Sequence, residues 1–333
     1  MKKKNLAPQL LKISGGLAVM ALAPGAAWGC ACGCGIFEVG TSAMFPEGSG
    51  GMAFQTYAFQ NQNQNWSDNS KTSAAYNADK NITTSFLSDG LEYMFNRSWG
   101  AEIEIPYAYR SFTTLNSPNL NGNVYSGGTP ATVKWWSLGD IRLHGIYTGF
   151  SEDLSSGIDF GVKLPTGSIS QEDPGDDVDR DSEIGTGSTD ILLGGFHRGT
   201  LVSSYGLDYF IQGEADLPVL VAGDYRPGFE FDAAAGVNYH GFKVGRANIS
   251  PLGQVLFSER TRDLGADAAG GVSDSPPIGI NSGYTRVLLS PGIEVHIHPI
   301  KIYADIAIPV LQHFNGDQLA APYMFKLSVS YMF

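Results

Sequence analysis

The sequence predicts an all-β protein: a transmembrane antiparallel up-and-down β-barrel of about twelve strands, preceded by a cleaved signal peptide. Segments of alternating polar and apolar residues run from residue 51 to the end. The connections between them alternate between short and long, as they do in bacterial outer-membrane barrels. The N-terminus has the layout of an export signal. The last segment is rich in aromatic residues and ends at Phe333, which is typical of the signal that barrel-assembly machinery recognises.

The first 29 residues are the predicted signal peptide. Lys2–Lys4 form its positive region, Gly15–Ala23 form its apolar core, and small residues follow up to Gly29. Cleavage after Gly29 would leave Cys30 first, and lipidation of Cys30 is the alternative. We expect three parts: the signal peptide at 1–29, a Cys- and Gly-rich periplasmic segment at 30–50 and the outer-membrane barrel at 51–333.

The composition argues against several classes of protein. With 42 glycines, 11% aromatic and 16% charged residues, the chain does not resemble a disordered protein. The formal net charge is −12, and removal of the four lysines in residues 1–29 makes it −16. Such acidity argues against nucleic-acid binding, which needs a basic face. No stretch after residue 29 has about 18 consecutive apolar residues, so no membrane-spanning helix is expected.

The strands follow from period-2 alternation. In the last one, Tyr323, Phe325 and Leu327 share a face that opposes Met324 and Lys326. A soluble β-sandwich also alternates. Export, charged faces repeated over many strands and the C-terminal segment favour a barrel in lipid, where every backbone group must pair. The predicted strands are 51–61, 82–96, 101–115, 133–150, 155–168, 189–202, 207–220, 226–242, 244–263, 284–299, 301–313 and 323–333.

The polar face of these strands is assigned to the lumen. Two interpretations follow: a salt-bridged network that plugs the barrel, or a wet acidic channel that favours cations. About twelve strands leave a narrow pathway, which segment 30–50 could obstruct. The lumen acids are Glu92, Glu102, Glu104, Asp140, Asp159, Asp208, Glu214, Asp216, Glu230, Asp232, Glu294 and Asp305, and the bases are Arg110, Arg142, Lys163, Arg246 and Lys326.

Aromatic residues near predicted strand ends fit the interfacial belts of a membrane barrel. These are Trp99, Trp135, Trp136, Tyr147, Phe150, Tyr205, Phe242, Tyr303, Tyr331 and Phe333.

No cofactor is expected, but three groups could hold a metal. Cys30, Cys32 and Cys34 could bind a soft ion, although a flexible tail with one disulfide or free thiols is the simpler interpretation. His296 and His298 share a face with Glu294, and His144 and His240 are further candidates for the lumen. The acidic loop 169–188 resembles the start of a calcium loop but lacks its glycine and its final glutamate, so a solvated loop is the default.

The sequence contains no motif of a serine hydrolase, a zinc protease or a nucleotide-binding loop. Scattered serines and histidines form no recognisable triad. We therefore expect that the protein is not an enzyme.

A motif in the middle of the chain resembles a known family. It consists of Gly139-Asp140, then Lys163-Leu164-Pro165-Thr166-Gly167, then Gly185-Thr186-Gly187-Ser188 and Asp190. This order is similar to that of the outer-membrane barrel family known as the putative MetA pathway of phenol degradation, also called "transporter". The resemblance implies a barrel over about residues 50–333 and passage of small, often aromatic or hydrophobic, compounds. Physically, Pro165 would end a strand and Gly167 would let the chain leave the barrel. Gly185 and Gly187 would let it return beside the next strand.

The leading hypothesis is a passive outer-membrane channel for small molecules, including hydrophobic or aromatic compounds. The expected partners are outer-membrane lipid, lipopolysaccharide, the barrel-assembly machinery and a small-molecule solute. The alternatives are a barrel that binds a metal or a partner through its cysteine cluster, and a plugged barrel with a structural or adhesive role. The sequence leaves the solute and the oligomeric state open.

Overall fold

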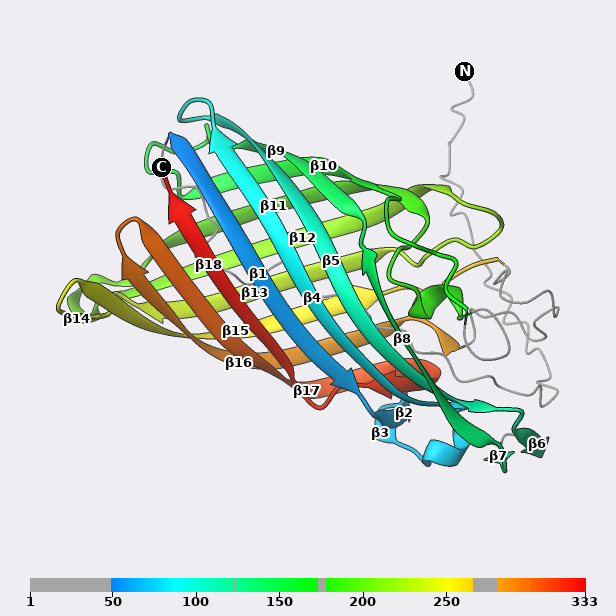
Figure 1. The fold of residues 1–333 in the computed structure, drawn as a ribbon. Coiled ribbons are helices and arrows are strands. Elements are labelled where there is room, and N and C mark those ends of the chain that lie inside the picture. Colours follow the sequence, from blue (N-terminus) through cyan, green and yellow to red (C-terminus); the bar gives the residue numbers. More distant parts are fainter. Residues whose placement is uncertain (1–48, 122–123, 173–177, 266–280) are drawn as a thin grey trace, which may run out of the picture.

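Twelve antiparallel strands form a closed barrel in the computed structural model, which describes residues 49–121, 124–172, 178–265 and 281–333. One of the twelve is interrupted and is formed by β8 and β9 (Figure 1). The barrel strands are β1 (Gly50–Gln62), β4 (Asp79–Met94), β5 (Trp99–Asn116), β8 (Thr129–Leu138), β9 (Ile141–Tyr147), β10 (Ser156–Leu164), β11 (Ser188–Val202), β12 (Leu207–Val221), β13 (Glu230–Tyr239), β15 (Ala247–Arg260), β16 (Tyr284–Ile297), β17 (Ile300–Ala320) and β18 (Met324–Met332).

The first and last strands close the barrel. β1 pairs with β18 in an antiparallel register that runs from Met52 opposite Met332 to Gln60 opposite Met324. Beyond that ladder, the N–H of Gly51 donates to the carbonyl of Phe333, and the N–H of Phe333 donates to the carbonyl of Gly51, both at 2.8 Å. Closure removes the open sheet edges, as a strand protein in a bilayer requires. The predicted all-β barrel is confirmed.

Side chains alternate between lipid and lumen as predicted. On β18, Val329 and Tyr331 are exposed on the outside, whereas Lys326, Ser328 and Ser330 are buried inside. Large apolar side chains are exposed along the outer faces of most barrel strands, including Leu193 on β11, which is 52% exposed. Because so much exposed apolar surface is stable only in lipid, the protein is a β-barrel of the bacterial outer membrane.

The strand predicted over 133–150 is interrupted at Gly139 and Asp140. The N–H of Gly139 donates to the carbonyl of Pro106 on β5 at 2.8 Å. On one side of this point β5 pairs with β8, from Tyr107 to Asn116, and on the other side it pairs with β9, from Trp99 to Glu104. The inserted residue shifts the inward face from odd positions, such as Trp135, to even positions, such as His144. This bulge determines which side chains of β9 reach the lumen.

Short elements occupy the segments that the sequence predicted as loops. β2 (Gln64–Asp68) and β3 (Ser70–Lys71) form a small hairpin that pairs with the C-terminal part of β17. The sequence predicted that this strand ends at residue 313, but β17 continues to Ala320 and includes Asn315, Gly316 and Asp317. These three residues form an irregularity in the pairing of β17 with β2. The remaining elements are β6 (Asn119–Asn121), β7 (Val124–Ser126), β14 (Phe242–Val244), η2 (Ala74–Tyr76), η3 (Arg180–Ser182) and η4 (Ser203–Tyr205).

Among the described residues, no helix is long and apolar enough to cross a bilayer.

Candidate functional site

Asp140 holds the start and the end of one long loop together. Its Oδ1 accepts the N–H of Gly167 at 2.9 Å. Its Oδ2 accepts both the N–H of Thr186, at 2.8 Å, and the Thr186 hydroxyl, at 2.6 Å. Gly167 follows β10 and Thr186 precedes β11, so one carboxylate joins the two ends of the connection between these strands. We call the described part of this connection, residues 165–172 and 178–187, the inward loop.

The glycines of the motif allow this close approach. A methyl group on Gly167 would lie 2.5 Å from the Cα of Gly185, so neither position has room for a side chain. Thr166 links the loop to the bulge, since its hydroxyl donates to the carbonyl of Gly139 at 2.8 Å and accepts the N–H of Ile141 at 2.9 Å. The motif that carries the family resemblance therefore forms a structural clasp at the strand exit and re-entry, as the sequence predicted.

The inward loop folds into the lumen. Arg110, an inward-facing residue of β5 that is 1% exposed, donates from Nη1 to the carbonyls of Ser182 and Glu183. Val178 and Ile184 of the loop pack in one apolar cluster with lumen-facing residues. The guanidinium of Arg180 lies 5.1 Å from the centre of the Tyr225 ring. The wall side of that cluster is formed by Ile82, Ala108, Phe112, Trp135 and Leu319.

One side of the lumen is lined by charged side chains of β5, β9, β10, β11 and β12, which we call the charged wall. Arg142 is 2.8 Å from Glu214 Oε1 and 3.4 Å from Asp216 Oδ2. Lys163 is paired with Asp190 and lies 2.8 Å from Asp216 Oδ2. The charged wall comprises Glu102, Glu104, Arg142, His144, Asp159, Lys163, Asp190, Glu214 and Asp216.

On the other side of the lumen, the inward faces of β12 to β18 carry a layer of apolar residues among polar ones such as Gln254 and Lys326, and we call it the apolar layer. Its buried members pack in one cluster, and Phe196 of β11 joins it from the side. Six of these side chains face inward from six different strands and Ala321 directly follows β17, so that together they form an apolar surface inside a membrane barrel. The apolar layer comprises Phe210, Ala234, Leu256, Leu288, Ala307, Ala321 and Met324.

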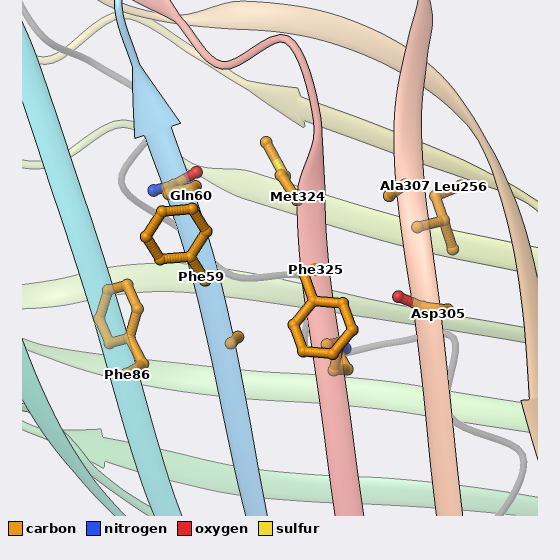
Figure 2. A pocket seen from close by; sticks show the side chains of 10 residues that line it. Phe59, Gln60, Phe86, Leu256, Asp305, Ala307, Met324 and Phe325 are labelled. Carbon is orange, nitrogen blue, oxygen red and sulfur yellow. The ribbon is translucent and has the colours of Figure 1, made fainter.

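A small pocket with a cavity volume of about 20 Å³ adjoins the apolar layer (Figure 2). Leu256, Ala307 and Met324 give it an apolar surface. Asp305 and Lys326, which are opposite each other in the pairing of β17 with β18, add charge. Gln254 donates to Asp305 Oδ2 at 3.0 Å, and the Tyr303 hydroxyl donates to the same oxygen. The remaining lining residues are Ala58, Phe59, Gln60, Phe86 and Phe325.

A polar vestibule opens at the end of the barrel with the short turns, which is the periplasmic end in outer-membrane barrels. It has a volume of about 330 Å³, and its wall includes Arg198, Asp208, Glu294 and Lys301. Phe210 lines the vestibule and also belongs to the apolar layer. A solute that enters from the periplasm would therefore meet apolar surface at Phe210.

Most residues assigned to the lumen from the sequence lie on inward-facing positions of the barrel strands. Glu230 and Asp232 face inward from β13, and the Tyr284 hydroxyl donates to Glu230 Oε1 at 2.8 Å. Asp208 lies at the vestibule, where it is 2.7 Å from Nε2 of His240. Asp140 is one exception, because it serves the clasp, and Arg246 is another. A role of these residues in a solute pathway remains a prediction.

Three predictions about individual side chains were wrong. Arg246 was assigned to the lumen but is exposed in the turn between β14 and β15. Trp135 and Tyr303 were assigned to the interfacial belts but are buried inside, at 7% and 1% exposure. Tyr303 lies between outward-facing Ile302 and Ala304 on β17, so the strand alternation turns it inward. The other predicted belt residues lie near strand ends, and most of them are exposed on the outside.

Several predictions fall on residues that the structure does not describe. Cys30, Cys32 and Cys34 lie outside the described residues, as does segment 30–50 apart from its last two residues. Asp177 of the calcium-like loop is also outside them. In the described part of that loop, Asp181 and Glu183 are buried. His296 and His298 are neighbours, with ring centres 6.4 Å apart.

The sequence itself matches no family model and no curated protein. The structure is similar to the COG4313 outer membrane channel from Pseudomonas putida F1, with a TM-score of 0.60 and 12% identity over 89% of this chain and 100% of that one. The fold is that of an outer-membrane barrel. Similarities to the β domain of the Bordetella autotransporter BrkA (TM-score 0.48, 13% identity, 86% and 100% covered) and to the CymD monoaromatic hydrocarbon channel (0.41, 9%, 86% and 89%) carry no further inference.

The clasp predicts that Asp140→Ala releases the inward loop. The substitution leaves the N–H groups of Gly167 and Thr186 without their acceptor, at a cost of about 1–3 kcal/mol for each group if it stays buried. We expect a higher single-channel conductance in planar bilayers and faster proteolysis within residues 165–187. Asp153→Ala, in an exposed turn, is the matched control. Equal conductance of wild type and Asp140→Ala would show that the loop does not obstruct the lumen.

The inward loop should also respond to pH through Glu183, which lies outside the membrane-spanning strands. Burial raises the pKa of Glu183 to about 7, although the N–H of Gln171 and the guanidinium groups of Arg110 and Arg180 oppose this shift. Glu183 therefore binds a proton more tightly when the loop lies in the lumen than when the loop is solvated. The stability of the inward position is greatest below the ordinary carboxyl pKa of 4.5 and falls as pH rises through about 7.

We therefore expect a several-fold higher open probability at pH 8 than at pH 5, measured in the same bilayers. Glu183→Gln removes the titrating group and should flatten this dependence, whereas Asp153→Asn should preserve it. The same pH profile in wild type and Glu183→Gln would contradict the assignment.

Proposed function

We propose that the protein is a passive outer-membrane channel for small apolar or aromatic compounds. The observation that carries this proposal is the apolar layer inside the barrel, with its pocket beside Leu256 and Met324. An apolar surface does not stabilise ions, which bind best to polar groups along their path. An apolar solute, in contrast, gains about 25 cal/mol for each Å² that it buries against such a surface.

The charged wall complements this surface. A pathway with one apolar side and one charged side can contact the ring of a phenolic compound and its hydroxyl at the same time. The motif around Asp140 supports the same class of solute through its resemblance to the barrel family of the putative MetA pathway of phenol degradation. The similar fold of a protein described as an outer membrane channel is consistent with it. Passage would follow a concentration gradient.

The proposal includes the environment of the barrel. Lipid and lipopolysaccharide would cover the apolar exterior, and the barrel-assembly machinery would insert the chain. A plugged structural or adhesive barrel is the second candidate, because the inward loop occupies part of the lumen. The two candidates differ in conductance, since a barrel plugged by the inward loop carries no current in the wild type, whereas a channel does.

The apolar layer predicts that phenol or toluene interrupts the current through the open channel. Leu256→Gln keeps the side-chain volume but places an amide in the pocket. We expect this variant to weaken the block by about 10-fold, within the range of about 1–3 kcal/mol that a changed pocket contact produces. The measurement is the concentration of solute that halves the mean current in a planar bilayer.

Asn238→Ala, in the vestibule and outside the apolar layer, is the control and should block like the wild type. An open channel that phenol and toluene do not block would contradict the proposed solute class. If the same solute concentration halves the current of the wild type and of Leu256→Gln, the pocket does not contact the solute.

A further inference from the structure

Three side chains of different types converge on the charged wall. They are His144 of β9, Asp159 of β10 and Glu214 of β12, and one potential ligand atom from each lies within 4.8 Å of the other two. They come from three strands spread over a four-strand stretch of the wall, so local sequence spacing does not explain the convergence. An imidazole and two carboxylates are the donors found in zinc and similar first-row metal sites.

The backbone around this cluster leaves room for the side chains to meet. Gly161 is opposite His144 in the pairing of β9 with β10, and a methyl group there would lie 3.2 Å from His144 Nδ1. Gly194 of β11 is opposite both Asp159 and Glu214, and a methyl group there would lie 2.3 Å from Asp159 Oδ2. Any other residue at Gly194 would displace the Asp159 carboxylate from the cluster.

One oxygen of the cluster makes no hydrogen bond. Within the described part of the chain, Asp159 Oδ2 is buried and accepts no hydrogen bond, and its partner is His144 Nδ1, which lies 3.8 Å away and forms an ion pair with it only when the imidazole is protonated. A buried carboxylate oxygen in this state is costly unless a cation or a proton reaches it. This unsatisfied oxygen and the space cleared by the two glycines are independent observations that point to a ligand at the same place.

The surroundings favour a cation as that ligand. Arg142 contacts Glu214 through Oε1, and a carboxylate has a second oxygen that can coordinate an ion while the first remains hydrogen-bonded. Glu102 is opposite His144 in the pairing of β5 with β9, where a further carboxylate lies beside the cluster. The charged wall holds six carboxylates against Arg142 and Lys163, so a bound divalent cation would offset part of an excess of negative charge.

We propose that His144, Asp159 and Glu214 form a site for a divalent first-row metal ion, of the Zn²⁺ type, on the charged wall of the lumen. The ion would link β9, β10 and β12 from the inside and leave coordination positions open to water or to Glu102. This site does not depend on the proposed passage of aromatic compounds.

Zinc titration of the refolded full-length chain by isothermal calorimetry tests the proposal. Cys30, Cys32 and Cys34 are first replaced by serine, so that thiolates cannot account for binding. We expect one equivalent of Zn²⁺ at micromolar affinity or tighter. His144→Ala and Asp159→Asn should each weaken binding by at least about 10-fold, and His296→Ala, which removes a lumen histidine elsewhere, should not.

A glycine pair separates ligation from general damage to the barrel. Gly194→Ala keeps every ligand but displaces Asp159, so we expect weaker binding of at least about 10-fold. Gly253→Ala adds the same methyl group where nothing lies within 4 Å, and its affinity should equal that of the parent. Heat-modifiable mobility in gels and circular dichroism verify that each variant is folded. No saturable binding in the cysteine-free chain, or equal affinity in the parent, His144→Ala and Gly194→Ala, would overturn the proposal.

Discussion

The rest of the structure depends on the requirement that every backbone group inside a bilayer finds a partner. The pairing of β1 with β18 meets this requirement by closing the sheet. Once the sheet is closed, alternation assigns each side chain to lipid or to the lumen. The lumen must then hold the polar residues of all twelve strands in a narrow space, where charges are stable only when they are paired, solvated or bound to an ion. The charged wall shows how this chain satisfies that condition.

The sequence predicted the elements that follow from alternation. Strand number, the β18 faces and the inward positions of Glu102, Lys163 and Asp216 all follow from period 2, which is a local property. Trp135 and Tyr303 were misplaced because their residue type suggested an interfacial belt, whereas their position on the strand determines their direction. Arg246 was misplaced because the predicted strand began at residue 244, whereas the chain reverses at Gly245 and the arginine lies in that turn.

The inward loop could not be predicted in the same way. Nothing in residues 165–187 distinguishes a loop that extends into solvent from one that folds into the barrel. The difference arises from contacts with distant residues, namely Asp140 on the bulge and Arg110 on β5. The convergence of His144, Asp159 and Glu214 was missed for the same reason, because it depends on the register of four strands. The glycines at 161 and 194 were a usable signal, since glycine inside a strand often marks a close approach.

The central claim is that solutes and ions pass through the lumen along the apolar layer. Cysteine accessibility tests it most directly, in a background where Cys30, Cys32 and Cys34 are serine. Ala307→Cys places a thiol on the apolar layer, and Ile306→Cys places one on the adjacent lipid-facing position. A small thiol-specific reagent should reduce the single-channel current of the Ala307→Cys variant and leave that of the Ile306→Cys variant unchanged. A current that the reagent does not alter in either variant, or no current in a folded barrel, would contradict the account.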